Sequence, residues 1–75
     1  MVANSSLISI NSDVRSGKPC VLGTRIAVSD ILQWLASGMS IEEILDDYPS
    51  LTNESIFAAL AFSANREAMM KTIIL

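Results

Sequence analysis

Residues 17–26, with the sequence GKPCVLGTRI, carry the types of side chain that could bind phosphate. A nucleotide-binding P-loop has four residues between its glycines and then Lys before Ser or Thr, so that backbone amides and the Lys surround the phosphate. Here five residues separate the two glycines, and Pro19 has no amide hydrogen. The spacing therefore argues against a nucleotide site and leaves two interpretations of this stretch open.

The first interpretation is a hairpin whose glycines serve only its turns. The second adds contacts between the polar side chains of the hairpin and the phosphates of DNA. Residues 14–29 hold three basic residues and no acidic one, a local charge of +3 in a chain of net charge −3. Basic side chains bind nucleic acid by neutralising its phosphates. The candidate DNA contacts in this segment are Arg15, Lys18, Thr24 and Arg25.

Four carboxylates lie within residues 42–47 as two pairs with a spacing of four. Paired carboxylates can bind Mg²⁺ or exchange protons. On a short amphipathic helix they also form an ordinary solvent-facing side, which is the interpretation we favour. The chain has no His, and its single cysteine, Cys20, cannot form a metal cluster or a redox pair. We therefore expect no enzymatic activity, no cofactor, no metal site and no small-molecule substrate.

Two short strands and three helices are expected to position these side chains in a single domain of residues 1–75. Residues 7–28 contain β-branched runs bounded by turn residues, which predict short strands and the basic hairpin. Apolar residues at helical spacing predict helices over 29–38, 40–48 and 52–70. Short connections between them indicate a mainly α fold, a three-helix helix-turn-helix bundle with a short N-terminal β-hairpin or arm.

A capping residue marks the expected start of each helix. Ser29 precedes Asp30 at the first helix, and Thr52 precedes the third. Ser40 and Glu43 have the spacing of a capping box at the second. A hydroxyl at these positions accepts a hydrogen bond from an unpaired N–H of the first turn, so the three positions predict where the helices begin.

The third helix opens with polar residues at the place where a recognition helix meets the edges of DNA bases. Asn53 has the side chain that binds adenine through two hydrogen bonds, and Ser55 can contact any base. The same residues are common in the first turn of any helix, so both interpretations stay open. Asn53 and Ser55 are the candidate base contacts.

Apolar residues are too numerous for so short a chain to bury alone. They make up 51% of the 75 residues, whereas a domain of about 60 residues buries only about 60% of the surface that its unfolded chain exposes. The third helix is apolar nearly all round, which predicts a second chain against it in a homodimer. The candidate interface residues are Trp34, Phe57, Ala61, Phe62 and Met69. Of these, Trp34 fits the core of the domain equally well.

The N-terminal residues give no sign of export or membrane insertion. They include no basic residue and no apolar run of signal-peptide length. No stretch of the chain reaches the ~18 apolar residues of a membrane span. We expect a protein of the reducing cytoplasm that makes no contact with a membrane.

Six short segments follow one another in a linked order: GKP at 17–19, GTRI at 23–26, GMSIEEIL at 38–45, YP at 48–49, LT at 51–52 and AAL at 58–60. In this order they resemble the bacterial family of domain of unknown function 433, over about Leu7 to Asn65. That family often has Arg where this chain has Leu22, and Pro where it has Ala27. The missing Arg weakens the basic hairpin as a DNA contact.

The resemblance implies both a fold and a role. Similar proteins have a homeodomain-like three-helix fold preceded by short strands, and several are antitoxin-like. The resemblance implies that such a protein pairs with a PIN-like ribonuclease toxin and binds its own operator DNA as a dimer. We therefore predict a small antitoxin-like helix-turn-helix protein. The alternative is a protein-interaction module without DNA affinity, which the acidic body of the chain and Leu22 favour.

Overall fold

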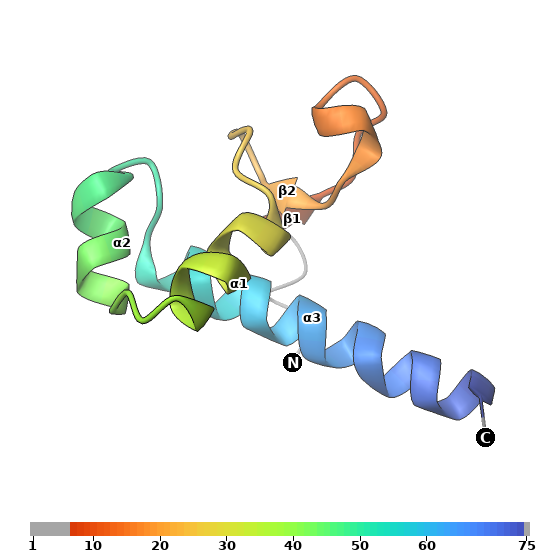
Figure 1. Cartoon of the computed structure of the whole chain (residues 1–75). Helices are drawn as coiled ribbons and strands as arrows, with labels where there is room; N and C mark the ends of the chain where they lie inside the picture. Colours follow the sequence, from red (N-terminus) through yellow and green to blue (C-terminus); the bar gives the residue numbers. More distant parts are fainter. Residues whose placement is uncertain (1–6, 75) are drawn as a thin grey trace.

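Three helices follow a short antiparallel β-hairpin along the chain (Figure 1). The computed structural model describes the backbone of residues 7–74 and the side chains of residues 7–65. The elements in order are β1 (Ile8–Ser9), the 3-10 turn η2 (Arg15–Gly17), β2 (Cys20–Val21), α1 (Val28–Ala36), α2 (Ile41–Asp47) and α3 (Asn53–Ile74). The predicted fold class, mainly α with three helices and an N-terminal hairpin, is confirmed.

The two strands are short and lean on the helices. Ile8 pairs with Val21, and Ser9 with Cys20, in antiparallel register. Cys20 also forms an isolated antiparallel bridge with Ala27, so that β2 lies between β1 and the residue before α1. A two-stranded sheet is marginal in water by itself. It persists here because Cys20 and Val21 are buried, with 2% and 3% of their surface exposed.

The first helix begins one residue before the predicted position. Ser29 was expected to cap it, but α1 starts at Val28 and its N-cap residue is Ala27. The Asp30 carboxylate explains the difference, because its Oδ2 accepts a hydrogen bond from the Ala27 N–H at 3.1 Å. A carboxylate at the third helical position can satisfy the N-cap amide without any hydroxyl at the cap itself.

The second helix begins with the predicted capping box. Ser40 Oγ accepts from the Glu43 N–H at 3.1 Å, and Glu43 Oε1 accepts from the Ser40 N–H at 2.8 Å. These two bonds satisfy donors that a helix start otherwise leaves free. The helix ends at Asp47, close to Pro49, which disfavours helical geometry in the residue before it.

The third helix begins after Thr52 as predicted and is longer than predicted. The Ser55 N–H donates to Thr52 Oγ1 at 3.2 Å, which makes Thr52 the N-cap. The helix reaches Ile74, past the predicted end at residue 70. None of the helices in the described part of the chain is long and apolar enough to cross a membrane.

The core lies where the three helices and β2 meet. Three isoleucines, one from each helix, are completely buried: Ile31, Ile44 and Ile56. Val21, Val28, Leu51 and Ala59 complete the buried cluster around them. Figure 1 shows α1 lying across α3, and this is the most extensive contact between elements. Apolar burial of this kind supplies most of the stability of a small helical domain.

We predict that Ile31→Val lowers the free energy of unfolding by about 0.5–1.5 kcal/mol, because it deletes one methylene from a fully packed site. The matched control is Ile10→Val, which makes the same chemical change at a side chain that is 64% exposed. It should change the free energy by less than about 0.5 kcal/mol. Urea denaturation measures both variants, and equal losses would contradict the assigned core.

Candidate functional site

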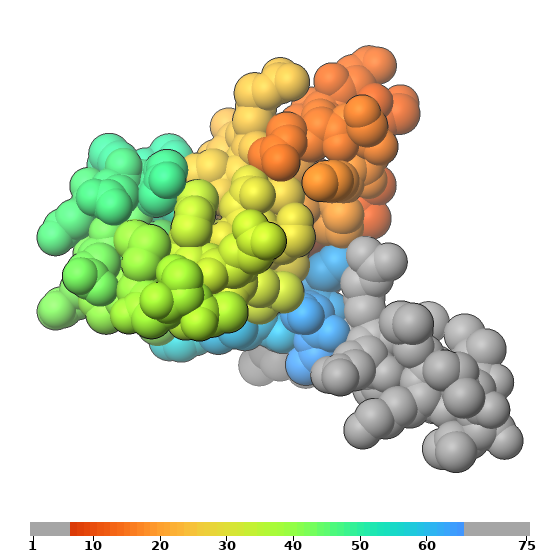
Figure 2. All heavy atoms as spheres, viewed as in Figure 1, coloured from red at the N-terminus to blue at the C-terminus, as the bar shows by residue number. Residues whose placement is uncertain are grey.

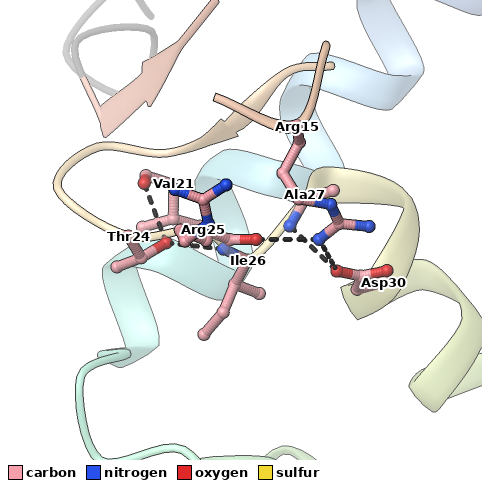
Figure 3. Close-up of polar contacts among 7 residues, drawn as sticks. All are labelled: Arg15, Val21, Thr24, Arg25, Ile26, Ala27 and Asp30. Atoms are coloured by element: carbon pink, nitrogen blue, oxygen red, sulfur yellow. Dashed lines mark hydrogen bonds and ion pairs between the residues drawn. The ribbon is translucent and has the colours of Figure 1, made fainter. Parts of the chain in front are cut away.

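In the turn after β2, the hydroxyl of Thr24, a predicted DNA contact, forms hydrogen bonds with the backbone of the turn. Thr24 Oγ1 donates to the Val21 carbonyl at 2.9 Å and accepts from the Ile26 N–H at 3.0 Å (Figure 3). Gly23, just before it, has a φ of +79°, which residues with a Cβ rarely adopt. The hydroxyl of Thr24 is therefore a turn-forming group, and its assignment as a DNA contact stays a prediction.

Arg15 joins three parts of the chain. Its Nη1 donates to Asp30 Oδ2 at 2.9 Å and to the Arg25 carbonyl at 2.8 Å (Figure 3). The guanidinium thereby connects the η2 turn, the turn after β2 and the first turn of α1. Arg15 and Ser16 also have φ values of 51° and 58°, which are costly for residues other than glycine. Arg15 therefore positions the hairpin, and its assignment as a DNA contact stays a prediction.

The other two cations of this region remain available to a partner. Lys18 and Arg25 are exposed. In the part of the chain that the structure describes, neither side chain forms an ion pair. Figure 3 shows that the backbone carbonyl of Arg25, and not its guanidinium, bonds to Arg15. Within the described residues, no acidic side chain therefore pairs with Lys18 or Arg25, and both charges remain open to a partner.

At the start of α3, the two predicted base contacts differ in how exposed their side chains are. Asn53 is exposed, and Glu54 beside it is exposed as well. Ser55 is only 6% exposed, and its Oγ accepts from the Thr52 N–H at 3.3 Å and lies 3.1 Å from Thr52 Oγ1. Ser55 is thus part of the helix cap, and its assignment as a base contact stays a prediction. Asn53 is exposed at the first position of the helix, and its role as a base contact stays a prediction.

The acidic residues of α2 face solvent. Glu42, Glu43, Asp46 and Asp47 are all exposed. Among the described residues, no three acidic, His or Cys side chains are grouped so that they could hold a metal ion. The hairpin adjoins the N-terminal end of α1 and α2 follows its C-terminal end, so the basic and acidic segments lie at opposite ends of this helix (Figure 1).

Two of the predicted interface aromatics belong to the edge of the core. Trp34 stacks on Tyr48, with ring centroids 4.2 Å apart and an angle of 11° between the planes. Trp34 and Phe62 are both half-buried and pack against the core cluster. Of the two interpretations of Trp34, the structure favours the core. Stacking of this α1 ring on Tyr48, the residue after α2, fixes the two helices against each other.

The outward face of α3 is apolar. Phe57 is 52% exposed and Leu60 is 38% exposed, while Ala61 is half-buried and Ala64 exposed. Figure 2 shows α3 along the lower edge of the molecule beneath α1. The side chain of Met69 lies outside the described residues. Sequence reasoning missed Leu60, because a helix that is apolar all round does not show which side the core will cover.

A second apolar surface was also missed. Ile10 and Leu22 are 64% and 58% exposed. They line an open hollow with Val14, Thr24 and Arg25, between the end of β1 and the turn after β2. Figure 2 shows these two segments as neighbouring projections at one end of the molecule. Nothing in the local pattern of the sequence marked this hollow, because its lining comes from two segments of the chain that only the fold brings together.

Comparison with known families decides the identity of the chain. The family model described as "Protein of unknown function (DUF433)" matches residues 8–63. The chain belongs to the DUF433 family. The match begins at β1 and ends within α3, so it includes the hairpin, all three helix starts and the whole described core.

Two known proteins are similar to this DUF433 protein. It is 33% identical over 63 residues to "Uncharacterized protein y4eO" of Sinorhizobium fredii (strain NBRC 101917 / NGR234), covering 84% of this chain and 28% of that protein. The chain thus spans little more than a quarter of that relative. The structure is also similar to the crystal structure of a DUF433 member protein from Anabaena variabilis ATCC 29413. There the TM-score is 0.76 at 30% identity, over 100% of this chain and 73% of the other.

The Arg15–Asp30 pair predicts a dependence of stability on pH. The hydrogen bond from Arg15 lowers the pKa of Asp30 below its ordinary value of 3.8. A lowered folded-state pKa contributes stability that is fully present above the ordinary value and is lost as the pH falls through the folded-state pKa. Asp30→Asn should therefore destabilise the protein at pH 7, by about 1 kcal/mol or less because the pair is partly exposed.

Urea midpoints at pH 7 and near pH 2 test this expectation. The difference between wild type and Asp30→Asn should shrink at the lower pH. Asp13→Asn is the matched control, because Asp13 is exposed and forms no ion pair within the described residues. A gap between wild type and Asp30→Asn that is the same at both pH values would contradict the role given to the pair.

Proposed function

We propose that this DUF433 protein acts by binding another protein chain through the outward face of α3, and not by catalysis. The exposed Phe57 and Leu60 are the observation that carries the proposal. Large apolar side chains grouped on one exposed surface are typical of interaction sites. Aromatic residues also supply a large share of the energy of protein interfaces. The opposite side of the helix is already used by the core, so this face remains for a partner.

The family resemblance supplies the class of partner. Antitoxin-like relatives pair with PIN-like ribonuclease toxins, and a short helical chain with an apolar outer face is suited to inhibit such an enzyme by covering it. We therefore assign the chain an antitoxin-like role. The full-length y4eO relative is much longer than this chain, so the role concerns the DUF433 domain.

The distribution of charge favours protein binding over DNA binding for α3. A helix-turn-helix unit places the start of its last helix in the major groove, close to phosphates. Here that region carries the exposed Glu54, and the preceding helix exposes Glu42, Asp46 and Asp47. Carboxylates beside a phosphate backbone are repelled. This arrangement favours a protein partner for α3.

DNA binding through the hairpin is the second candidate. It is supported by Lys18 and Arg25, which are exposed and without an ion pair among the described residues. Such contacts would be made to phosphates and would position the protein without reading sequence. Asn53 would be the remaining contact to a base.

A binding experiment with a purified, tagged PIN-like ribonuclease tests the first proposal. The tagged nuclease should retain the wild-type chain, and Phe57→Ser should reduce retention about tenfold, as expected for the loss of a buried aromatic anchor. Ile10→Ser is the matched control, since it removes another exposed apolar side chain from a different surface. Equal retention of the three proteins, or none at all, would overturn the assignment of α3.

Salt dependence tests the second candidate on the protein's own upstream DNA. Each phosphate contact contributes about −0.9 to the slope of log affinity against log salt, so Lys18→Ala with Arg25→Ala should flatten the slope by about 2. Gln33→Glu with Ser50→Glu is the control, because it gives the same net charge through exposed positions away from the hairpin. Absence of binding at low salt, or the same slope in both variants, would exclude the hairpin as a DNA contact.

A further inference from the structure

We propose that the open hollow between the loop after β1 and the turn after β2 is a docking site for an extended acidic peptide segment of another protein. The segment would place two adjacent apolar side chains in the hollow and a carboxylate beside Arg25. The hollow lies on the hairpin and not on α3, so it is a second interaction surface that goes beyond the proposed function.

Two segments of the chain form the walls of this hairpin hollow. Residues 9–12 and 14 form one wall, and residues 22–25 form the other. Figure 2 shows these segments as the orange and yellow projections at one end of the molecule. The hollow measures about 810 Å³, a size at which proteins bind ligands. Because it is open, it suits a peptide that lies across it better than a small molecule that must be enclosed.

Both walls of the hairpin hollow carry apolar side chains. Ile10 and Val14 line one wall, and Leu22 lines the other. Ile10 and Leu22 are the two most exposed large apolar side chains in the part of the chain that the structure describes. Consecutive side chains of an extended peptide point to opposite sides. Two adjacent apolar residues of a peptide would therefore cover both walls at once.

A single charge selects the kind of peptide. Of the nine residues that line the hairpin hollow, only Arg25 is charged, and Asp13 is not part of the lining. The Arg25 side chain is exposed and forms no ion pair among the described residues. A peptide carboxylate can accept two hydrogen bonds from a guanidinium. A DNA phosphate would also attract Arg25, but it would leave Ile10 and Leu22 uncovered, so the lining favours a peptide.

Hydrogen bonds hold both walls in place before any peptide binds. In one wall, the Val14 N–H donates to the Asn11 carbonyl at 2.9 Å. In the other, the Thr24 hydroxyl bonds to the backbone of its own turn. Arg15 follows the first wall in the chain and donates to the Arg25 carbonyl in the second (Figure 3). A site formed in advance loses less conformational freedom on binding than a loose one.

Nuclear magnetic resonance with synthetic peptides tests the site on the full, isotope-labelled chain. The probe is a short peptide in which two adjacent leucines are flanked on both sides by aspartates. Amide signals of residues 9–14 and 22–25 should shift, because these segments form the walls. A peptide with serines in place of the leucines should bind about tenfold more weakly. One with lysines in place of the aspartates should bind about threefold more weakly.

A substitution on the second wall tests the apolar contact. Leu22→Ser should weaken binding of the aspartate peptide about fivefold, because it removes a side chain that the peptide leucines would cover. Phe57→Ser is the matched control, since it removes an exposed apolar side chain from α3 and should leave this affinity unchanged.

Charge reversal tests the second contact. Arg25→Glu should make the lysine peptide bind more tightly than the aspartate peptide. Arg15 bonds to the backbone carbonyl of residue 25, so this change of side chain leaves the walls connected. Gln33→Glu with Ser50→Glu is the matched control, because it gives the same net charge through exposed positions outside the hollow. The control should keep the preference for aspartate.

Equal affinities of the three peptides, or an unchanged affinity in Leu22→Ser, would overturn the inference. Signals of the two walls that respond to double-stranded DNA and to none of the peptides would also overturn it. The proposed function is tested separately, because nuclease binding is assigned to Phe57 on α3 and peptide binding to Leu22 and Arg25 on the hairpin.

Discussion

The packing of α1 against α3 is the contact on which the rest of the structure depends. Ile31 and Ile56 are completely buried there, and Ile44 of α2 closes the same core. The two strands are too short to be stable without it, and they persist because Cys20 and Val21 are buried against this core. Since one side of α3 is committed to α1, its other side is fixed in space and presents Phe57 and Leu60 outward.

One carboxylate connects this core to the basic hairpin. Asp30 satisfies the amide of Ala27 at the start of α1, and it also accepts the hydrogen bond from Arg15, which in turn holds the carbonyl of Arg25. The turn that carries Arg25 is thereby attached to a rigid helix. A cation on a positioned turn loses less conformational freedom on binding than one on a loose loop. The pair thus holds the backbone of Arg25 in place and leaves its guanidinium outside the ion pair.

Charge and apolar surface are separated in this DUF433 protein. Exposed cations lie before and after β2, carboxylates lie on α2, and apolar side chains lie along the outer side of α3. Surfaces of such different chemistry suit different partners, since like charges exclude a wrong partner and apolar contacts retain the right one.

The sequence by itself determined the features whose causes are local. The capping box of Ser40 and Glu43 and the start of α3 after Thr52 each depend on residues three apart, so they were predicted correctly. Only the tertiary structure decided the roles of Arg15 and Trp34, because Arg15 bonds to Asp30 fifteen residues away and Trp34 stacks on Tyr48 of another segment. It also decided which apolar side chains of α3 remain exposed, because a helix that is apolar all round can be buried on any side until the packing of α1 selects one.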